Sequence, residues 1–427
     1  MKHHPSATRP VAAPLGEADR RLGRRLAIAS HPLGMTFALV FTQHLPTLAL
    51  VALGASEAVV GVQSASGAAD LLRLPTLRVV GIVSKRAILI SGQLAALGAA
   101  LPLLCFPLLL ESARSGSGGA VAISLAMFGL LGATAGTRIC ETVWFPMLRS
   151  YVEPERIGRF FGVLRSGWHL ALIVYYLGAS AWLARHPDGF GPLFAVAWTC
   201  GLLRIALIRR LPERSERTGE RIRVREAFAL IREDPALRRY LLGTSTAAAV
   251  RGSVVPFAIV MLRREVGFTD GEVLTTTVAA FAGGFASLYL WGRLVDRVGA
   301  APVFRFTSLA GAGLIAALVL VEQSTPSTLG WLIAFFFCFS VLTAGFGVAD
   351  THVLFGLAPE AAPARTLVIA GVVVTLLGSL APLAVGFVLE QALAGRESGR
   401  LLVYHGFFVA AAAAQASAFL PLRRFRG

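Results

Sequence analysis

Long apolar runs constrain the fold of this 427-residue chain more than any other feature of its sequence. The runs are about 19 to 28 residues long, and short polar stretches separate them. A helix needs about 20 residues to cross the roughly 30 Å of hydrocarbon in a bilayer. The composition agrees with this interpretation, because 55% of the residues are hydrophobic and only 15% are charged. The sequence therefore predicts an all-α membrane protein.

Twelve transmembrane spans fit the pattern. They cover residues 33–53, 56–78, 87–110, 119–148, 160–184, 190–208, 240–262, 272–295, 301–321, 328–355, 366–390 and 401–421. An arginine-rich segment separates the first six spans from the last six. The predicted organisation is a tail (1–30), a six-helix bundle (31–208), a linker (209–239), a second six-helix bundle (240–421) and a short tail (422–427).

Basic residues lie mainly in alternate loops. The segments on the side of both termini carry 31 Lys and Arg, whereas the loops on the other side carry 6. Positive charge is retained on the cytoplasmic side during insertion, so we expect both termini in the cytoplasm and the protein in a bacterial inner membrane. Lipid headgroups also account for the net charge of +16, so nucleic acid is not an expected partner.

The sequence carries no pattern typical of a cofactor site. Its four cysteines lie inside apolar runs without a CxxC pair, and the loops hold no nucleotide-binding Gly-Lys-Ser/Thr motif. We therefore expect neither a metal nor another cofactor, and no enzymatic activity. The expected surroundings are the lipid bilayer, with the chain as a monomer.

An internal repeat relates the two halves. Residues 134–145 of the fourth span read Thr-Ala-Gly-Thr-Arg-Ile-Cys-Glu-Thr-Val-Trp-Phe. Residues 343–354 of the tenth span, 209 residues later, read Thr-Ala-Gly-Phe-Gly-Val-Ala-Asp-Thr-His-Val-Leu. The alignment places Glu141 on Asp350 and Arg138 on Gly347. Many transporter folds consist of two related halves with the substrate site between them.

The segment Gly292-Arg-Leu-Val-Asp-Arg-Val-Gly299 resembles a loop signature of the major facilitator superfamily, and the resemblance covers essentially all twelve spans. Residues 154–162 are similar to another loop of bacterial members. The corresponding first-half loop, residues 77–86, lacks the signature's Gly and Asp. The resemblance implies two pseudo-symmetric six-helix bundles, with spans one, four, seven and ten lining a central cavity. It also implies gating roles for Gly292, Arg293, Asp296, Arg297 and Arg159.

An aspartate at a helix end can latch two halves by pairing with an arginine, and Asp296 with Arg293 or Arg297 is the candidate latch. The alternative is that these charges only mark the membrane edge.

Ionisable groups inside the hydrocarbon zone cost several kcal/mol, so each one is a candidate for function. His44 and Arg251 each lie about 16 Å into their spans, near the bilayer midplane. We predict them as substrate-binding residues together with Arg138. Arg251 offers a permanently charged fork suited to a carboxylate or phosphate, and His44 can change protonation near neutral pH.

Glu141 and Asp350 are the predicted proton-coupling residues, because a carboxyl without a permanent partner can carry a proton. The alternative is a structural charge network, in which Arg138 pairs with Glu141 three residues away. Asp70 and Arg73 are expected to form an interhelical network. Arg204, near a helix end, is expected to reach the lipid headgroups.

Two functions remain open from the sequence. One is secondary transport of a small polar or anionic solute by alternating access, with proton coupling as an option. The other is a non-transporting protein of the same fold that assists the assembly of a membrane complex.

Overall fold

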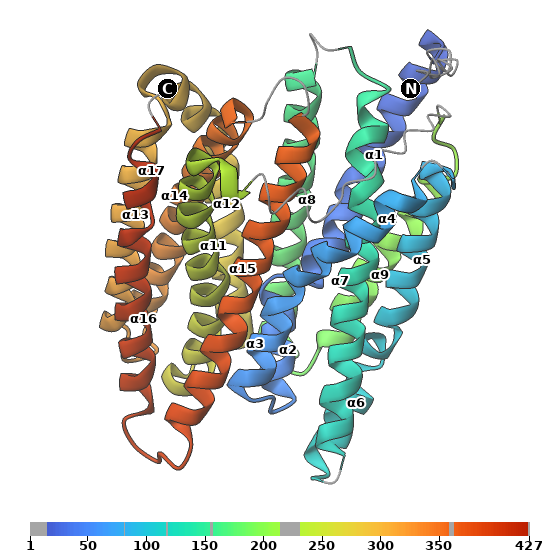
Figure 1. Cartoon of the computed structure of the whole chain (residues 1–427). Coiled ribbons are helices and arrows are strands. Elements are labelled where there is room, and N and C mark those ends of the chain that lie inside the picture. The colour runs from blue at the N-terminus through green and yellow to red at the C-terminus, as the bar shows by residue number, and fades with distance from the viewer. Residues whose placement is uncertain are drawn as a thin grey trace, which may run out of the picture.

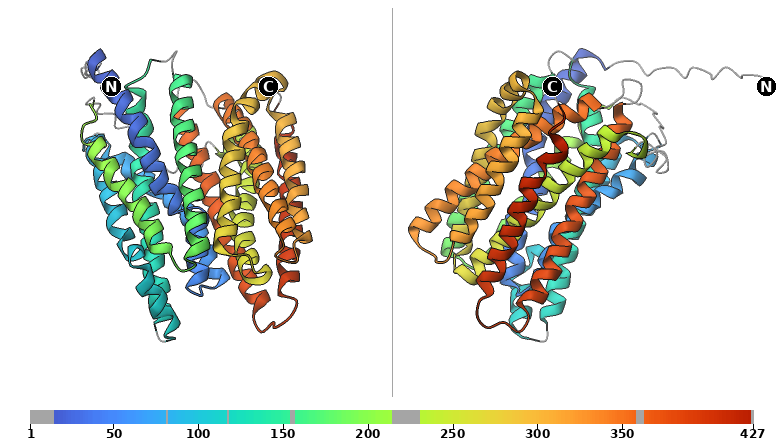
Figure 2. Two further views of the ribbon diagram at one scale, coloured as in Figure 1. Left: turned by 180° about the vertical axis from the view of Figure 1, so that it is seen from behind. Right: turned by 60° about the vertical axis from the view of Figure 1, so that its left-hand side comes forward.

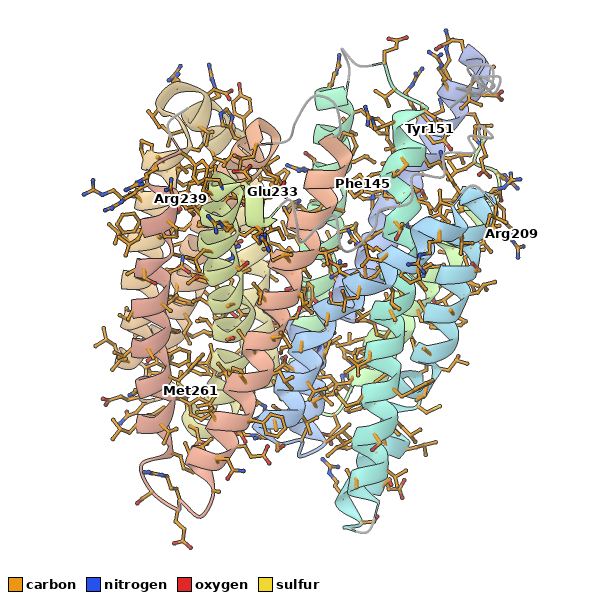
Figure 3. All side chains as sticks on the ribbon, viewed as in Figure 1. Phe145, Tyr151, Arg209, Glu233, Arg239 and Met261 are labelled. Carbon is orange, nitrogen blue, oxygen red and sulfur yellow. The ribbon has the colours of Figure 1, made fainter. Side chains whose placement is uncertain are left out.

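A computed structural model describes residues 15–80, 82–116, 118–153, 157–213, 231–357 and 363–425, and these residues are almost entirely helical. The first described helix begins, and the last described helix ends, at the same end of the molecule (Figure 1). We call this end, which carries Glu17 and Leu422, the terminal face, and the opposite end the loop face. Arg209, Glu233 and Arg239 lie toward the terminal face, whereas Met261 lies toward the loop face (Figure 3).

The first half of the chain forms one bundle. Its helices are α1 (Glu17–Val40), α2 (His44–Ala52), α3 (Glu57–Ser64), the 3-10 helix η1 (Ala65–Leu72), α4 (Arg73–Val79), α5 (Lys85–Leu104), α6 (Phe106–Arg114), α7 (Gly119–Arg149), α8 (Ile157–Arg185) and α9 (Phe190–Ile208).

The second half forms another bundle. Its helices are α11 (Pro235–Met261) with a π-helical turn (Leu262–Val266), α12 (Asp270–Val298), α13 (Ala300–Ala317) with the 3-10 turn η4 (Leu318–Leu320), α14 (Pro326–Leu357), α15 (Pro363–Leu393), α16 (Arg400–Ser417) and α17 (Phe419–Leu422). The linker prediction falls largely outside the described residues, which exclude 214–230.

Within the described residues, eleven helices are long and apolar enough to cross a membrane, and they correspond to all predicted spans except the second. The structure divides that span into α3, η1 and α4. Pro75 explains part of the division, because it has no N–H to donate to the carbonyl of Leu71 and its ring would clash with that carbonyl in a continuous helix. The glycines and serines of 61–67 add little helical propensity.

The first span is interrupted as well. Helix α1 begins at Glu17, inside the predicted tail, and the chain leaves the helix at Phe41 before α2 begins at His44. Pro46 cannot continue the hydrogen bond to the carbonyl of Thr42, which accounts for the position of the break. The break places His44 at the start of a helix deep in the bundle.

Local capping residues fix where other helices begin. Asp234 accepts hydrogen bonds from the backbone N–H groups of Ala236 and Leu237 at 2.8 and 3.1 Å, and α11 starts directly after it. Thr269 and Glu272 form a reciprocal capping box at the start of α12. Both signals are local in the sequence.

Buried apolar side chains form three clusters that differ in which bundles they join. One cluster, which includes Phe37, Phe257 and Phe336, draws on both bundles and extends to the loop face. A second cluster around Tyr240 belongs to the second bundle alone, and a third around Trp144 belongs to the first alone. The two bundles therefore share an apolar core toward the loop face and keep separate cores toward the terminal face.

Helices α3 and α15 form one of the closest contacts between the bundles, as do α8 and α12 (Figures 1 and 2). A Cβ added to Gly61 would lie 2.6 Å from the carbonyl oxygen of Pro382, so only glycine permits this approach. Gly386 faces Glu57 and Gly61 in the same way. The small residues of the second span thus lie at the boundary between the halves.

Candidate functional site

A cavity of about 510 Å³ lies between the bundles. Helices α1, α2, α3 and α8 contribute to its wall from the first bundle, and α11, α12 and α14 from the second. The fourth-span helix α7, which the family resemblance placed on the cavity, contributes no lining residue. We call this space the central cavity.

His44 lies on the wall of the central cavity. Its Nδ1 is 2.5 Å from the hydroxyl of Thr277 on α12, and its ring centroid is 5.8 Å from that of Phe336. The imidazole is buried and bridges the two bundles. A role for His44 in substrate binding remains a prediction.

Arg251 lines the central cavity from α11 and is half-buried. Its guanidinium carbon lies 4.7 Å from the ring centroid of Phe346, in a cation–π contact. It forms no hydrogen bond or ion pair with another described residue. Arg251 is therefore oriented by an aromatic ring while its N–H groups remain available.

Arg138 and Glu141 form the local pair that the sequence predicted, with Arg138 Nη1 donating to Glu141 Oε2 at 2.9 Å. Arg73 donates to the same carboxylate and lies 3.1 Å from Asp70, which is also 3.3 Å from Arg138. The expected Asp70–Arg73 network is thus part of a four-residue cluster. None of the four lines the central cavity, so the structure does not bring Arg138 together with His44 and Arg251.

Asp350 lies on α14 one turn from Phe346, and it also does not line the central cavity. Its Oδ1 accepts a hydrogen bond of 2.7 Å from the hydroxyl of Tyr240. The charge of Arg251 acts on it electrostatically, but the two side chains form no direct ion pair. Among the described residues, Asp350 therefore has no cationic partner in contact, unlike Glu141.

The predicted gating residues lie at or near the surface of the terminal face. Gly292, Arg293, Asp296 and Arg297 occupy the end of α12, and Arg159 lies near the start of α8. The Arg293 guanidinium lies 5.5 Å from the ring of Tyr289 on the same helix. Within this described segment, Asp296 forms no ion pair with Arg293 or Arg297, so the proposed latch contact is absent from this arrangement.

An ion pair that the sequence did not suggest joins the bundles at the loop face. Arg264, at the end of the seventh span, donates to Glu57 Oε1 at 2.7 Å and also to the carbonyl of Ala55. The hydroxyl of Tyr404 on α16 donates to the same Glu57 oxygen at 2.9 Å. Arg264 is one of only six basic residues in the loops opposite the termini. Its presence on the side that is poor in basic residues could have indicated a specific role.

Further hydrogen bonds reinforce the loop face. The backbone N–H of Ala58 donates to Glu390 of α15 at 3.0 Å, and the Ser180 hydroxyl lies 2.8 Å from the Gly271 carbonyl and 2.9 Å from Thr275. Among the described residues, the hydrogen bonds and ion pairs between bundles lie at His44 or closer to the loop face.

The expectation that Arg204 reaches the lipid headgroups is wrong. Its side chain is buried inside the first bundle, where it donates to Gln93 at 2.9 Å and lies 5.1 Å from the ring centroid of Trp144. An added Cβ on Gly34 would collide with it, so the small residue makes room for the guanidinium. The position of a helix end in the sequence did not reveal which way the side chain points.

Comparison with solved structures supports the same architecture. A mutant of the nucleoside transporter NupG matches at a TM-score of 0.72 with 12% identity, covering 93% of this chain and 99% of that one. A bacterial homologue of the iron transporter ferroportin gives 0.69 with 17% identity, covering 95% and 99%. The D-xylose-proton symporter gives 0.67 with 17% identity, covering 95% and 97%. At these identities the likeness concerns the fold.

The sequence itself matches no curated protein significantly. It does match the family model of the Major Facilitator Superfamily over residues 134–382, which is more than half of the chain and includes parts of both bundles. The family match agrees with the helical bundles and with the signature at 292–299. This multi-pass membrane protein belongs to the Major Facilitator Superfamily.

Proposed function

We propose that the protein is a secondary transporter that moves a small polar or anionic solute across the bacterial inner membrane by alternating access. The observation that carries this proposal is the central cavity, which both bundles line and which contains Arg251 without an ionic partner among the described residues. A charged side chain in the middle of a membrane bundle is costly unless it faces water or a ligand. A solute site between two related halves provides that setting.

The distribution of contacts supports alternating access. Closure on one side, with separate cores on the other, is one of the two states that such a cycle requires. The Glu57–Arg264 pair and the shared apolar core would hold the loop face closed. Following the arginine distribution, the terminal face with both termini is cytoplasmic and the closed face is periplasmic.

For proton coupling, Asp350 is a better candidate than Glu141. Glu141 contacts two arginines, which stabilise its charged form continuously. Asp350 accepts a hydrogen bond from Tyr240 and interacts electrostatically with Arg251. An anion bound to Arg251 would therefore change the electrostatic field at this carboxylate. Coupling at Asp350 would link solute binding to proton uptake through Arg251.

Reconstitution into proteoliposomes tests the proposal. Uptake of a panel of labelled solutes is measured with and without an imposed proton gradient, and protein-free liposomes provide the background. We expect gradient-stimulated uptake of at least one solute. If the whole panel fails to move, the transport assignment fails and the alternative role in membrane-complex assembly becomes the better hypothesis.

Labelling with a membrane-impermeant thiol reagent tests alternating access separately. Ser340→Cys, placed on the cavity wall in a background with all four native cysteines replaced, is labelled from each side of oriented vesicles. We expect labelling from the terminal face. Adding Glu57→Gln weakens the ion pair with Arg264 and should increase labelling of Ser340→Cys from the loop face. Equal labelling from the loop face with and without Glu57→Gln would contradict the closure model.

A further inference from the structure

The charges around the central cavity restrict what it can bind. Among its described lining residues Arg251 is the one with a permanent charge, and no Asp or Glu is present. The remaining polar lining residues carry hydroxyls or amides, apart from His44 and the indole N–H of Trp168. A cation would meet a guanidinium that has no ion-pair partner on the cavity wall, and a dianion would lack a second cation there. The lining therefore favours a solute with one negative charge.

Arg251 is prepared for such a solute by its surroundings. The ring of Phe346 lies against the guanidinium, and no described carboxylate forms an ion pair with it. A planar guanidinium presents a fork of N–H donors that matches a carboxylate. An anion reaching Arg251 would gain charge-assisted hydrogen bonds without first displacing a protein partner.

Two hydroxyl groups lie on the same part of the wall. Ser340 and Thr343 are three residues apart on α14, so they share a helix face, and both line the central cavity. Thr343 and Arg251 also line a second, smaller space together, which places them as neighbours. The hydroxyls of Ser340 and Thr343 can therefore donate hydrogen bonds to the oxygens of an anionic group bound at Arg251.

The rest of the cavity accommodates an apolar body. Trp168 and Phe281 meet edge to face at 6.3 Å between ring centroids, and Phe336 and Phe339 face the cavity from α14. Aromatic walls of this kind supply a large apolar contact area and ring faces on which a planar group can stack. The volume of about 510 Å³ is that of a small-molecule pocket and exceeds what an inorganic anion needs.

We propose that the central cavity binds amphipathic organic monoanions, with the anionic group on Arg251, Ser340 and Thr343 and an aromatic or apolar body between the aromatic side chains. This inference rests on the proposed function, since it names the solute class of the same site. It narrows that function by excluding cations, dianions and inorganic anions as preferred ligands.

Binding to the purified full-length protein in lipid nanodiscs tests the inference without any gradient. The probes are benzoate, 3-phenylpropanoate and indole-3-propanoate as monoanions. For 3-phenylpropanoate the matched compounds are its uncharged amide, 3-phenylpropylamine as a cation, phenylsuccinate as a dianion and propanoate without a ring. We expect 3-phenylpropanoate to bind about tenfold more tightly than each matched compound, because each of these lacks either a single negative charge for Arg251 or a ring for the aromatic walls.

Variants assign the binding to the site. Arg251→Gln should weaken binding of the monoanion about tenfold or more, and Arg251→Lys should restore part of it. Arg305→Gln removes an exposed arginine of α13 at the terminal face and should leave binding unchanged. Equal affinity for the acid and its amide, an Arg251→Gln variant with unchanged affinity, or no binding of any aromatic acid would each overturn the inference.

The result separates from that of the transport proposal. Monoanion binding that depends on Arg251, without uptake in proteoliposomes, would refute transport and leave the ligand class standing. Uptake of a neutral or cationic solute through the same cavity would refute the ligand class and leave transport standing.

Discussion

Glu141 and Asp350 occupy the same position of the internal repeat, yet the two bundles surround them differently. Glu141 contacts Arg73 and Arg138, and with Asp70 they form a cluster whose charges balance. Asp350 accepts one hydrogen bond from Tyr240, and Arg251, whose charge acts on it, contacts an aromatic ring instead.

The difference begins with single residues of the repeat. Arg138 corresponds to Gly347, so the second bundle lacks the arginine that would neutralise Asp350 from one turn away. A duplicated helix can therefore keep its carboxylate while its neighbours change. We infer that the four-residue cluster of the first bundle stabilises the structure and that Asp350 and Arg251 of the second serve transport.

The two arginines provide the strongest test of this comparison. Arg251→Gln should lower kcat/KM for uptake roughly 10- to 100-fold, because a charged hydrogen bond to the solute is lost. Its stability should fall only slightly, since the contact with Phe346 is lost but no ion pair between described residues is broken. Arg138→Gln is the matched change in the first bundle. It should lower the melting temperature more than Arg251→Gln does, and it should lower the uptake rate less. The opposite ranking would reverse the assignment of the two bundles.

Gly347→Arg would make the second bundle resemble the first. The new guanidinium would lie three residues from Asp350 on the same helix face, and a Cβ at Gly347 meets nothing within 4 Å. If Asp350 carries the coupled proton, a permanent partner should make uptake insensitive to pH between mildly acidic and mildly alkaline conditions. Uptake that keeps its normal pH profile would exclude Asp350 as the coupling residue.

Neutralising the carboxylates one at a time should separate stability from coupling. Glu141→Gln leaves two partly buried arginines with weaker partners and should cost about 1–3 kcal/mol of stability. Asp350→Asn keeps an oxygen that accepts from Tyr240, so its melting temperature in detergent should change less. A larger loss of stability in Asp350→Asn than in Glu141→Gln would contradict the view that the first bundle holds the structural charges.

Tyr240→Phe is expected to have the smallest effect. It removes one hydrogen bond to Asp350 and should cost about 1 kcal/mol of stability. The carboxylate then loses its one described donor, so the pH profile of uptake should shift even though the fold persists. Thermal unfolding and initial rates at several pH values measure the two effects, and an unchanged profile would remove Tyr240 from the coupling model.

Much of the architecture could be predicted from the sequence, because bilayer crossing and insertion impose local and statistical rules. Apolar length predicts each span, and arginine asymmetry indicates the alternation of the loops. The second span was predicted as one continuous helix, but Pro75 and the small residues before it divide it into three shorter helices. The constant rise per residue of a helix also predicted a shared depth for His44 and Arg251, and both line the central cavity.

Partners between helices could not be predicted in this way. The sequence placed Arg138 with the substrate residues and Arg204 at the headgroups, whereas the structure engages Arg138 in an ion-pair cluster and buries Arg204 against Trp144. It gave no indication that Glu57 meets Arg264 across the bundles. Each of these outcomes depends on the rotation of a helix about its axis relative to its neighbours.

The sequence by itself determined that this chain crosses the membrane many times in two related halves, and that His44 and Arg251 lie deep within them. These properties follow from hydrophobic length, charge asymmetry and the repeat, all of which are encoded along the chain. The tertiary structure alone decided which of those charges neutralise one another and which one faces the cavity. Pairing requires atoms of different helices to come within a few ångströms, and only the packing of the helices sets those distances.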